Sequence, residues 1–375
     1  MRWYNAFVFR GERGFVHGGF DVEDGRFAGV FTDEREGEID LCGALVIPGL
    51  VDIHTHGAMG ADFSDGDAQG LRRMAAHLAG CGVTSFAPTS MTLPYGTLER
   101  AFATAAELYA DRPEGCARVM GVHMEGPYFS EKKKGAQNGA YLKKPDFEGF
   151  RKLFEGCGGL VRIVDVAPEL EGAAAFTKEA KALCTVSVAH TDADYDEASA
   201  VFDAGASHLT HLYNAMPGIH HRKPGPIGAA SERESVVAEL ICDGLHVHPS
   251  AVRMAFRLFP GRICLISDSL RCCGMPDGEY ELGGQQVFLS GGVARLADGT
   301  IAGAASDLYA DMRNAVRFGV PREEAILAAT IRPAREIGRE SEIGSIEEGK
   351  LADFVVCGED LALRAVCIGG KRVER

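Results

Sequence analysis

The sequence predicts an α/β protein in which a TIM-type (β/α)8 barrel is joined to a small β-sandwich domain formed by both ends of the chain. Three observations favour this fold: the middle section alternates strand-like runs with helical patterns, both ends consist of short strand-like segments, and titratable side chains follow nearly every strand-like run of the middle. A chain of 375 residues has room for one barrel with an accessory domain. We expect the small domain at 1–48 plus 346–375 and the barrel at 49–345.

The middle section contains eight apolar, strand-like runs. They cover residues 50–57, 82–87, 119–124, 161–167, 185–190, 208–211, 236–242 and 263–268. Apolar residues at helical spacing predict amphipathic helices between them, namely Leu71, Met74, Ala75 and Leu78 in one segment and Leu98, Phe102, Ala105 and Leu108 in another. Eight such repeats favour a closed barrel. An open doubly wound sheet is the alternative, although no G-x-G-x-x-G motif follows the first strand.

Short strand-like segments make up both ends of the chain. They lie at 6–9, 14–17, 19–22 and 27–31 near the start, and at 352–357 and 366–373 near the end. Glycine and acidic turns separate them. The shared pattern predicts one sheet domain built from both termini; two unrelated terminal arms are the alternative.

The composition is that of a soluble globular protein, with 46% hydrophobic and 25% charged residues. No apolar run reaches the length of about eighteen residues that a membrane span needs, so we expect no membrane contact. Residues 1–5 lack the apolar stretch of a secretion signal, and the eleven cysteines show no C-x-x-C spacing, which together predict a cytoplasmic protein. The net charge of −14 argues against a nucleic-acid partner, and a small anionic substrate would need a local cationic pocket.

The first predicted barrel strand ends in two histidines. Side chains alternate along a strand, so His54 and His56 project from the same face. Pro48 and Gly49 interrupt the chain just before this strand, and Gly57 follows it. Two neutral imidazoles placed in this way can bind one cation such as Zn, Fe or Ni. An incidental surface pair is the alternative interpretation.

Three further side chains at strand ends form a second candidate metal set. Glu125 precedes a Gly-Pro pair, and His190 and His211 end two successive strands. A lone histidine at such a position is more often a core residue, but a Glu/His/His set leaves a coordination position open for water. The pKa of that water can fall to about 7. The pattern therefore predicts a hydrolytic metal site.

Asp268 follows the last predicted barrel strand, across the barrel mouth from these ligands. We predict that it is a general base that takes a proton from water and passes it to a leaving amine. The alternative is that its carboxylate caps the next helical segment.

Basic residues follow His211. The segment 220–223 reads His-His-Arg-Lys, and Arg222 in it favours recognition of a phosphate; a solvated loop is the alternative. The lysine run 132–134 is interpreted as solvated, and the adjacent pair Cys272 and Cys273 as structural or incidental.

Several motifs resemble those of one protein family. PGLVDIHTHG at 48–57 and IGSIEEGKLADFVV at 343–356 are similar to signatures of the amidohydrolase superfamily. Others resemble the N-acetylglucosamine-6-phosphate deacetylase family within it, namely HMEGPY at 123–128, AHT at 189–191, THLYNAMPG at 210–218, DGLHV at 243–247 and SDS at 267–269. These motifs span nearly the whole chain in the family's order.

The resemblance implies a role for each matching residue. It implies metal ligation by Glu125, His190 and His211, a second ion at His54 and His56 in members that keep both histidines, and acid–base catalysis by Asp268. It implies sugar-phosphate contacts by Asn214, Ala215, Arg222 and His246, with Arg222 reaching the site of a partner subunit in a homodimer. The cofactor would be a divalent metal, Zn or Fe, bound as one or two ions.

One position departs from the family's pattern. Some members carry a histidine that polarises the acetyl carbonyl, whereas this chain has Gln137. A glutamine amide can donate a hydrogen bond to an oxyanion but cannot carry a proton. We therefore expect Gln137 to assist the metal in activating the carbonyl.

These features lead to the hypothesis of a cytoplasmic, metal-dependent deacetylase that converts N-acetylglucosamine 6-phosphate to glucosamine 6-phosphate and acetate. Three alternatives stay open: N-acetylgalactosamine 6-phosphate as the substrate, another small amide cleaved by an amidohydrolase, and a non-catalytic assembly protein that reuses the barrel. The lack of an evident bridging lysine and the basic segment 220–223 argue against the second, and retention of every ligand argues against the third.

Overall fold

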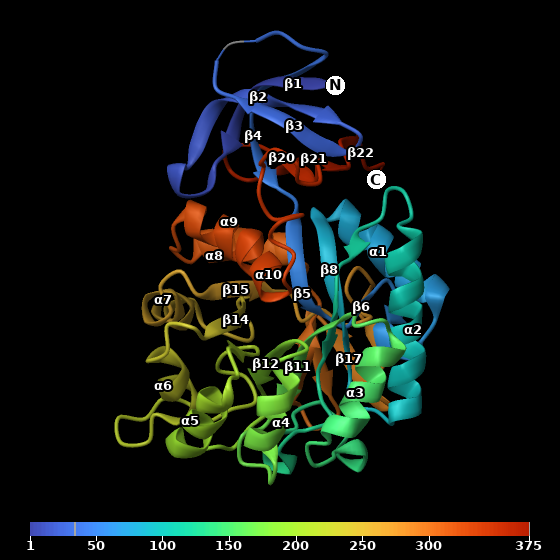
Figure 1. The fold of residues 1–375 in the computed structure, drawn as a ribbon, viewed down its shortest axis with the longest axis vertical. Helices are drawn as coiled ribbons and strands as arrows, with labels where there is room; N and C mark the ends of the chain where they lie inside the picture. The colour runs from blue at the N-terminus through green and yellow to red at the C-terminus, as the bar shows by residue number, and fades with distance from the viewer. Residues whose placement is uncertain (34, 375) are drawn as a thin grey trace.

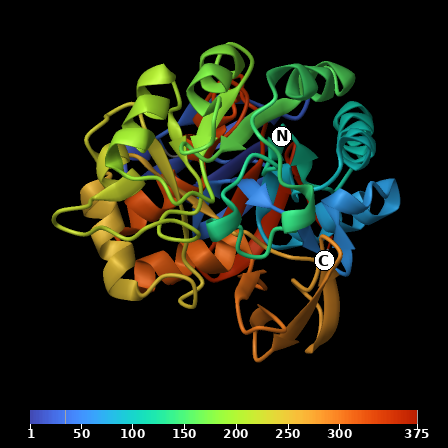
Figure 2. The same cartoon turned by 90° about the horizontal axis from the view of Figure 1, so that it is seen from below.

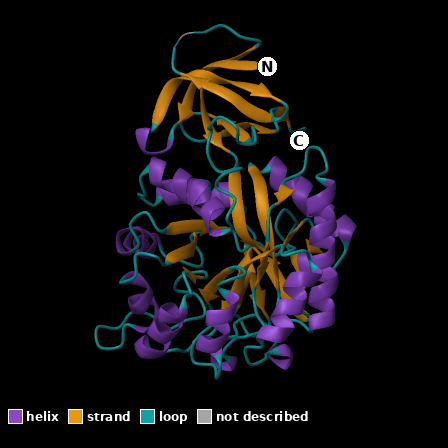
Figure 3. Ribbon diagram, in the orientation of Figure 1, coloured by secondary structure: helices purple, strands orange, loops and turns teal. Residues whose placement is uncertain are grey.

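The computed structural model describes residues 1–33 and 35–374; positions 34 and 375, both inside the predicted terminal domain, lie outside the described residues. Parallel strands form the centre of the molecule (Figures 1 and 3). In spatial order they are β15 (Ile263–Ile266), β14 (Val237–Ile241), β13 (His208–Leu209), β12 (Thr185–Val188), β11 (Val161–Val166), β10 (Val122–Met124), β8 (Val83–Ser90) and β5 (Leu50–Thr55).

The two ends of this series meet. The Asp268 N–H, just after β15, donates to the carbonyl of His54 in β5, and the His56 N–H donates to the carbonyl of Ser269, both over 2.9 Å. The predicted (β/α)8 barrel is therefore confirmed as a nearly closed barrel, and the open doubly wound sheet is excluded.

Helices surround the barrel (Figure 2). They are α1 (Ala68–Gly80), α2 (Tyr95–Asp111), α3 (Phe147–Gly156), α4 (Ala173–Ala180), α5 (Tyr195–Ala204), α6 (Gly225–Ser231), α7 (Pro249–Leu258), α8 (Leu308–Arg317), α9 (Arg322–Ala329) and α10 (Ile331–Glu336). The apolar faces predicted for α1 and α2 are buried, as expected. Aspartate side chains cap several first turns, Asp67 at α1 among them. No helix in residues 1–33 and 35–374 combines the length and the hydropathy that a membrane crossing requires.

Short strands and 3-10 turns complete the fold. They are the strands β6 (Gly57–Ala58), β7 (Ala61–Asp62) and β9 (Arg118–Val119), and the 3-10 turns η1 (Gly11–Arg13), η2 (Phe63–Asp65), η3 (Glu131–Lys133) and η4 (Gly139–Tyr141).

Both termini form one mixed sheet, as predicted (Figure 1). Its strands, in spatial order, are β22 (Lys371–Arg372), β21 (Leu363–Ile368), β20 (Phe354–Cys357), β4 (Ile39–Pro48), β1 (Arg2–Phe9), β2 (Phe15–Glu23) and β3 (Arg26–Phe31). The two ends of the chain join where β4 pairs antiparallel with β20. Two unrelated terminal arms are therefore excluded.

Aromatic side chains fill the core of the terminal sheet. Phe354 from the C-terminal part packs against Phe20 and Trp3 from the N-terminal part, with ring centroids 4.9 and 5.0 Å apart. Phe27 packs edge-on against Phe20 at 5.2 Å. All four side chains are buried, so apolar burial holds the two chain ends together.

A third sheet was not predicted. It consists of four antiparallel strands, β16 (Gly278–Leu282), β17 (Gln285–Ser290), β18 (Val293–Leu296) and β19 (Ile301–Ala304). In the sequence they come between β15 and α8, and in space they project beside the barrel (Figure 2). The Leu270 N–H donates to the carbonyl of Ala304 over 2.9 Å, which ties this sheet to the loop that carries Asp268.

Candidate active site

The predicted site residues gather at the carboxyl ends of the barrel strands. Glu125 directly follows β10, His190 and His211 lie two residues beyond β12 and β13, and Asp268 lies two beyond β15. These four side chains and His56 line a cavity of about 410 Å³. Clustering of this kind is expected at the carboxyl face of a barrel, because that face is where the strand-to-helix loops meet.

Glu125, His190 and His211 converge on one centre. The Oε1 atom of Glu125 lies 3.1 Å from Nε2 of His190 and 3.2 Å from Nε2 of His211. The two imidazole Nε2 atoms lie 3.1 Å apart. All three side chains are buried. Three strands therefore bring together the Glu/His/His set that the sequence predicted.

His54, His56 and Asp268 form an adjoining group. Oδ1 of Asp268 lies 3.2 Å from Nε2 of His56 and 3.6 Å from Nε2 of His54. The two groups meet at Glu125, whose Oε1 lies 3.6 Å from Nε2 of His54 and whose Oε2 lies 3.4 Å from Nε2 of His56. The site therefore has two carboxylates facing four imidazole nitrogens.

Main-chain carbonyls set the orientation of two rings. Nδ1 of His190 donates to the carbonyl of Lys133 over 2.9 Å, and Nδ1 of His56 donates to the carbonyl of Thr89 over 3.1 Å. A carbonyl oxygen only accepts, so Nδ1 carries a proton in both rings. Nε2 is then the atom that faces the carboxylates, which is the arrangement that metal-binding histidines adopt.

His54 provides the test of whether a cation fits. Its Nδ1 donates to Oε2 of Glu239 over 2.9 Å, which leaves Nε2 facing Glu125 and Asp268. That Nε2 is buried and has no hydrogen-bond partner among the residues the structure describes. Leaving a buried polar atom unsatisfied costs free energy, and a cation among these rings and carboxylates would satisfy it. The donor set therefore fits a divalent metal of the kind that binds imidazole and carboxylate together.

The electrostatics of the site favour positive charge. Burial disfavours the ionised form of Glu125, but hydrogen bonds from His190 and His211 outweigh it and hold the pKa of Glu125 well below its usual range. Burial likewise opposes protonation of His56 and His211, yet Asp268 and Glu125 raise the pKa of both imidazoles to about 9. The two carboxylates therefore stabilise positive charge in the site, which either protonated imidazoles or a bound divalent cation supplies.

The backbone is left-handed at three residues of the two candidate metal groups. His190, His211 and Asp268 have φ values of 43°, 30° and 49°. Residues other than glycine rarely adopt this conformation, and such strain is concentrated at functional sites. Hydrogen bonds stabilise it at Asp268, whose N–H donates to the His54 carbonyl and whose carbonyl accepts from Ala304, both over 2.9 Å.

Gln137 lines the cavity and contacts a predicted ligand. The Thr92 N–H donates to Oε1 of Gln137 over 2.7 Å, which directs the amide nitrogen towards the cavity. That nitrogen donates to Oε2 of Glu125. Gln137 therefore helps to orient Glu125, and its predicted role as an oxyanion donor stays a prediction.

The predicted substrate-binding residues divide into two groups. Asn214, Ala215 and His246 line the cavity, and Nδ1 of His246 is held 2.7 Å from Oδ2 of Asp243. Arg222 lies in an exposed segment outside the cavity lining, where its guanidinium contacts the neighbouring His221. Within this chain, the structure does not bring Arg222 to the cavity.

Sequence reasoning missed other cavity residues. Residues 300–303, which lead into and form part of β19, line the cavity from the unpredicted third sheet. Lys132 is exposed and pairs with Asp192 over 3.0 Å, as expected of a solvated residue, but it also lines the cavity together with Lys133.

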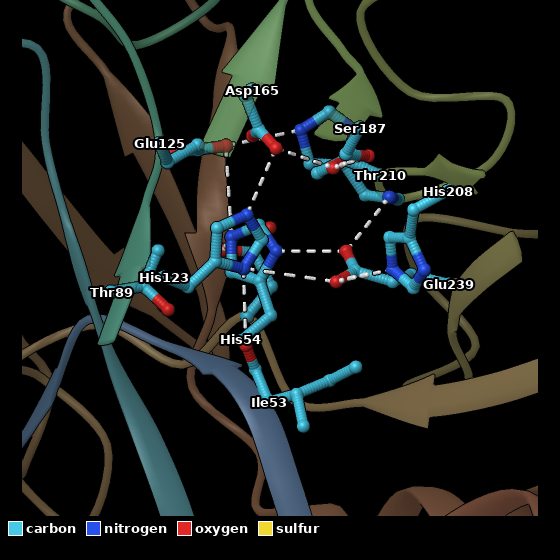
Figure 4. A network of polar contacts seen from close by, with 12 residues as sticks. Ile53, His54, Thr89, His123, Glu125, Asp165, Ser187, His208, Thr210 and Glu239 are labelled. Atoms are coloured by element: carbon cyan, nitrogen blue, oxygen red, sulfur yellow. Dashed lines mark hydrogen bonds and ion pairs between the residues drawn. The ribbon is translucent and has the colours of Figure 1, made fainter. Parts of the chain in front are cut away.

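It also missed a buried polar network below the site (Figure 4). Its titratable members in the barrel interior, all fully buried, are His123, Asp165, His208 and Glu239. Nε2 of His123 lies 3.0 Å from Oδ1 of Asp165, and Nε2 of His208 lies 3.2 Å from Oε1 of Glu239. A charged residue within an apolar strand, such as Glu239 in Val237–Ile241, is the sequence signal that could have revealed it.

Comparison with known proteins places the chain in a family. Residues 45–373 match the amidohydrolase family. The chain is 37% identical to the N-acetylglucosamine-6-phosphate deacetylase of Bacillus subtilis (strain 168), with 93% of this chain and 91% of the relative covered. It is also 37% identical to the N-acetylgalactosamine-6-phosphate deacetylase of Escherichia coli O157:H7, with 91% and 89% covered.

Solved structures of deacetylases have the same fold as this chain. A mutant N-acetyl-D-glucosamine-6-phosphate deacetylase from Mycobacterium smegmatis, solved in complex with N-acetyl-D-glucosamine-6-phosphate, matches with a TM-score of 0.94 at 32% identity, over 100% of this chain and 99% of that chain. The corresponding enzyme from Pasteurella multocida matches with a TM-score of 0.92 at 27% identity, over 100% and 99%. The chain therefore belongs to the amidohydrolase family, in its branch of N-acetylhexosamine-6-phosphate deacetylases.

Proposed function

We propose that the protein is a metal-dependent deacetylase that hydrolyses N-acetylglucosamine 6-phosphate to glucosamine 6-phosphate and acetate. The observation that carries the proposal is the convergence of Glu125, His190 and His211 on one centre in a cavity that Asp268 also lines. Relatives of that activity at 36% and 37% identity, over 90% and 93% of this chain, support the substrate class.

The residues that would hold the metal are those of the two adjoining groups. Glu125, His190 and His211 would bind one ion, and His54 and His56 would contribute to a second, with Zn or Fe as the candidate metals. When bound, the cation lowers the pKa of a water molecule and polarises an amide carbonyl.

Asp268 is proposed as the acid–base catalyst. Burial opposes its ionisation, but the neighbouring imidazoles of His54 and His56 hold its pKa below the usual range, so the side chain is a carboxylate at neutral pH. It takes a proton from the attacking water, the water oxygen bonds to the acetyl carbon, and the C–N bond then breaks. Asp268 returns the proton to the departing nitrogen, which leaves as the amine.

Gln137 supports this chemistry from the side of the carbonyl. Its amide nitrogen is fixed by the hydrogen bond between Thr92 and its oxygen and already faces Glu125. We propose that its second N–H donates to the developing oxyanion.

Recognition of the sugar phosphate is proposed to need two subunits. Asn214, Ala215 and His246 line the cavity of their own chain, whereas Arg222 lies on an exposed segment that could extend to a neighbour. We propose a homodimer in which Arg222 of each subunit binds the phosphate in the other's cavity. We also propose a cytoplasmic location, since no disulfide joins any of the eleven cysteines within residues 1–33 and 35–374.

The relative from Escherichia coli O157:H7 favours a second candidate substrate, N-acetylgalactosamine 6-phosphate. The epimers differ only in the orientation of one hydroxyl, so the metal site and Asp268 would serve both.

Acetate release from a panel of sugars tests the proposal. The panel contains both N-acetylhexosamine 6-phosphates and unphosphorylated N-acetylglucosamine, each assayed with Zn²⁺ and with Fe²⁺. We expect rapid release from N-acetylglucosamine 6-phosphate and little from the unphosphorylated sugar. Faster release from the galactosamine compound would select the second candidate, and no release from either phosphate would contradict the proposal.

A further inference from the structure

One carboxylate below the cavity contacts both candidate metal groups. Glu239, on β14, is fully buried. Its Oε2 atom accepts the Nδ1–H of His54 over 2.9 Å (Figure 4). The same atom accepts the main-chain N–H of His211 over 3.1 Å. His54 belongs to one metal group and His211 to the other, so a single oxygen atom links the two.

The other oxygen of Glu239 is held from below. Oε1 lies 3.2 Å from Nε2 of His208, whose Nδ1 lies 2.8 Å from a carboxylate oxygen of Glu336. Both ring nitrogens of His208 therefore face carboxylates, so both must donate and the ring is an imidazolium. The positive charge of His208 offsets the negative charge of Glu239 and holds its carboxylate in place. A buried carboxylate is stable only with charged or hydrogen-bonding partners.

We propose that Glu239 is a positioning residue for the metal centre. It fixes His54 in the tautomer and orientation in which Nε2 faces Glu125 and Asp268, and it stabilises the left-handed main chain at His211. The inference rests on the proposed function, since it takes His54 and His211 as metal ligands. Hydrogen bonds to the non-ligating nitrogen of a metal-binding histidine govern metal affinity by about 10- to 100-fold.

Glu239→Gln separates this role from a simple packing role. Glutamine keeps the size of the side chain but has one accepting oxygen. If that oxygen faces His54 and His211, His54 keeps an acceptor but exchanges a carboxylate for a neutral amide, whose hydrogen bond is weaker and raises the basicity of the ring less. In the reverse orientation His54 loses its acceptor. In both orientations the hydrogen bond that holds His54 is weakened or lost while the space stays filled.

Asp165 provides a matched control. It is also fully buried in the barrel interior and belongs to the same network. Its Oδ1 atom lies 3.0 Å from Nε2 of His123 and accepts the Thr210 hydroxyl over 3.0 Å. Neither partner is among the five metal ligands proposed above. Asp165→Asn therefore removes the same charge from the same region without touching His54.

Zn²⁺ affinity of the full-length protein is the first test. Metal-depleted wild type, Glu239→Gln and Asp165→Asn are titrated with Zn²⁺ against a chromophoric chelator. We expect Glu239→Gln to bind about 10- to 100-fold more weakly, and Asp165→Asn to bind like wild type even if its melting temperature falls. Wild-type affinity in Glu239→Gln, or an equal loss in both variants, would overturn the inference. Failure of wild type to bind Zn²⁺ or to release acetate would instead count against the proposed function.

A second test measures the wild-type protein, so its outcome does not depend on the folding of a Glu239 variant. Nitrogen-15 labelling of the histidines lets NMR report which ring nitrogen carries the proton, and the His54 signals are assigned by their loss in His54→Asn. We expect the proton on Nδ1 and a metal-dependent shift at Nε2. A His54 signal with the proton on Nε2 in the zinc-loaded protein would contradict the role of Glu239.

Discussion

The core of the terminal sheet and the polar network inside the barrel are both buried but chemically opposite. In the terminal sheet, Trp3, Phe20 and Phe354 pack ring against ring. In the barrel, His208 and Glu239 are completely buried and bring ionisable groups into a region of low dielectric. Apolar burial contributes about 25 cal/mol per Å² to stability, whereas buried charges cost desolvation that their partners only partly return.

This difference indicates what each region is for. The terminal sheet joins the two chain ends through β4 and β20 and contributes stability. The barrel contains buried charge and left-handed backbone at His190, His211 and Asp268, features that are concentrated at functional sites. Substitutions in the two regions should therefore have opposite signatures, with loss of stability in one and loss of activity in the other.

The largest effect is expected at Asp268. Asp268→Asn keeps the shape of the side chain, and asparagine tolerates the left-handed φ of 49° better than most residues. Because the amide cannot accept the proton of water, kcat should fall by about 10²- to 10⁴-fold with little change in melting temperature. Steady-state acetate release measures the first quantity and calorimetry the second. Turnover near that of wild type would remove Asp268 from its assigned role.

Phe354→Ala is the counterpart in the terminal sheet. Phe354 is 0% exposed, so its truncation should lower the free energy of unfolding by about 3–5 kcal/mol and leave kcat/KM of the folded enzyme unchanged. Phe288→Ala is the control, since Phe288 on β17 is 36% exposed and should lose far less. Urea denaturation of the three proteins checks the order. A loss in Phe354→Ala no larger than that in Phe288→Ala would contradict the assignment of stability to the aromatic core of the terminal sheet.

Arg222→Ala tests a site that belongs to neither region. If Arg222 binds the substrate phosphate in a partner's cavity, its loss should raise KM about 10- to 100-fold, as expected for a hydrogen bond to a charged group, without changing stability. Dimers that mix two different variant subunits test whether Arg222 acts in the cavity of its partner. Arg222→Ala mixed with Asp268→Asn should recover activity, because one cavity of each mixed dimer then has both groups. No recovery in verified mixed dimers would contradict sharing between subunits.

The smallest effect concerns pH and the buried charge of the barrel. Burial opposes protonation of His208, but Glu239 and Glu336 outweigh it and raise the pKa of His208 to about 10. Between the unfolded pKa of about 6.5 and this value, His208 holds a proton in the folded protein that it lacks in the unfolded chain, so it should lower stability by about 1.4 kcal/mol per pH unit as pH rises. His56 and His211, whose pKa values are also raised, add to the slope in both proteins. Unfolding free energies at pH 7, 8 and 9 should therefore fall more steeply in wild type than in His208→Gln, by about 1.4 kcal/mol per pH unit. The same slope in both proteins would show that His208 is not the group that titrates.

Much of the barrel could be predicted because the sequence carries its periodicity openly. Each strand-like run corresponds to a strand, and the titratable residue after the run, such as Glu125 or Asp268, marks the carboxyl end where the cavity lies. The third sheet was missed because its short segments between Gly278 and Ala304 were not recognised as strands outside the barrel repeat.

The network below the site was missed for a different reason. Residues at strand ends, such as His190, follow from the position of an apolar run. Asp165 and Glu239 lie within strands, where the apolar pattern gives no sign of a polar partner. Which of these groups meet depends on the register of neighbouring strands, and the sequence does not specify that register. The position of Arg222 relative to a cavity is likewise not specified by the sequence, because the cavity that it is predicted to reach belongs to another subunit.

Metal analysis of the purified protein tests the central claim most directly. We expect wild type to retain one or two divalent ions per chain through gel filtration, and Glu125→Gln, which removes the carboxylate charge shared by both histidine groups, to lose them while still folding. A wild-type protein that carries no metal yet releases acetate at full rate after exhaustive chelation would contradict the account.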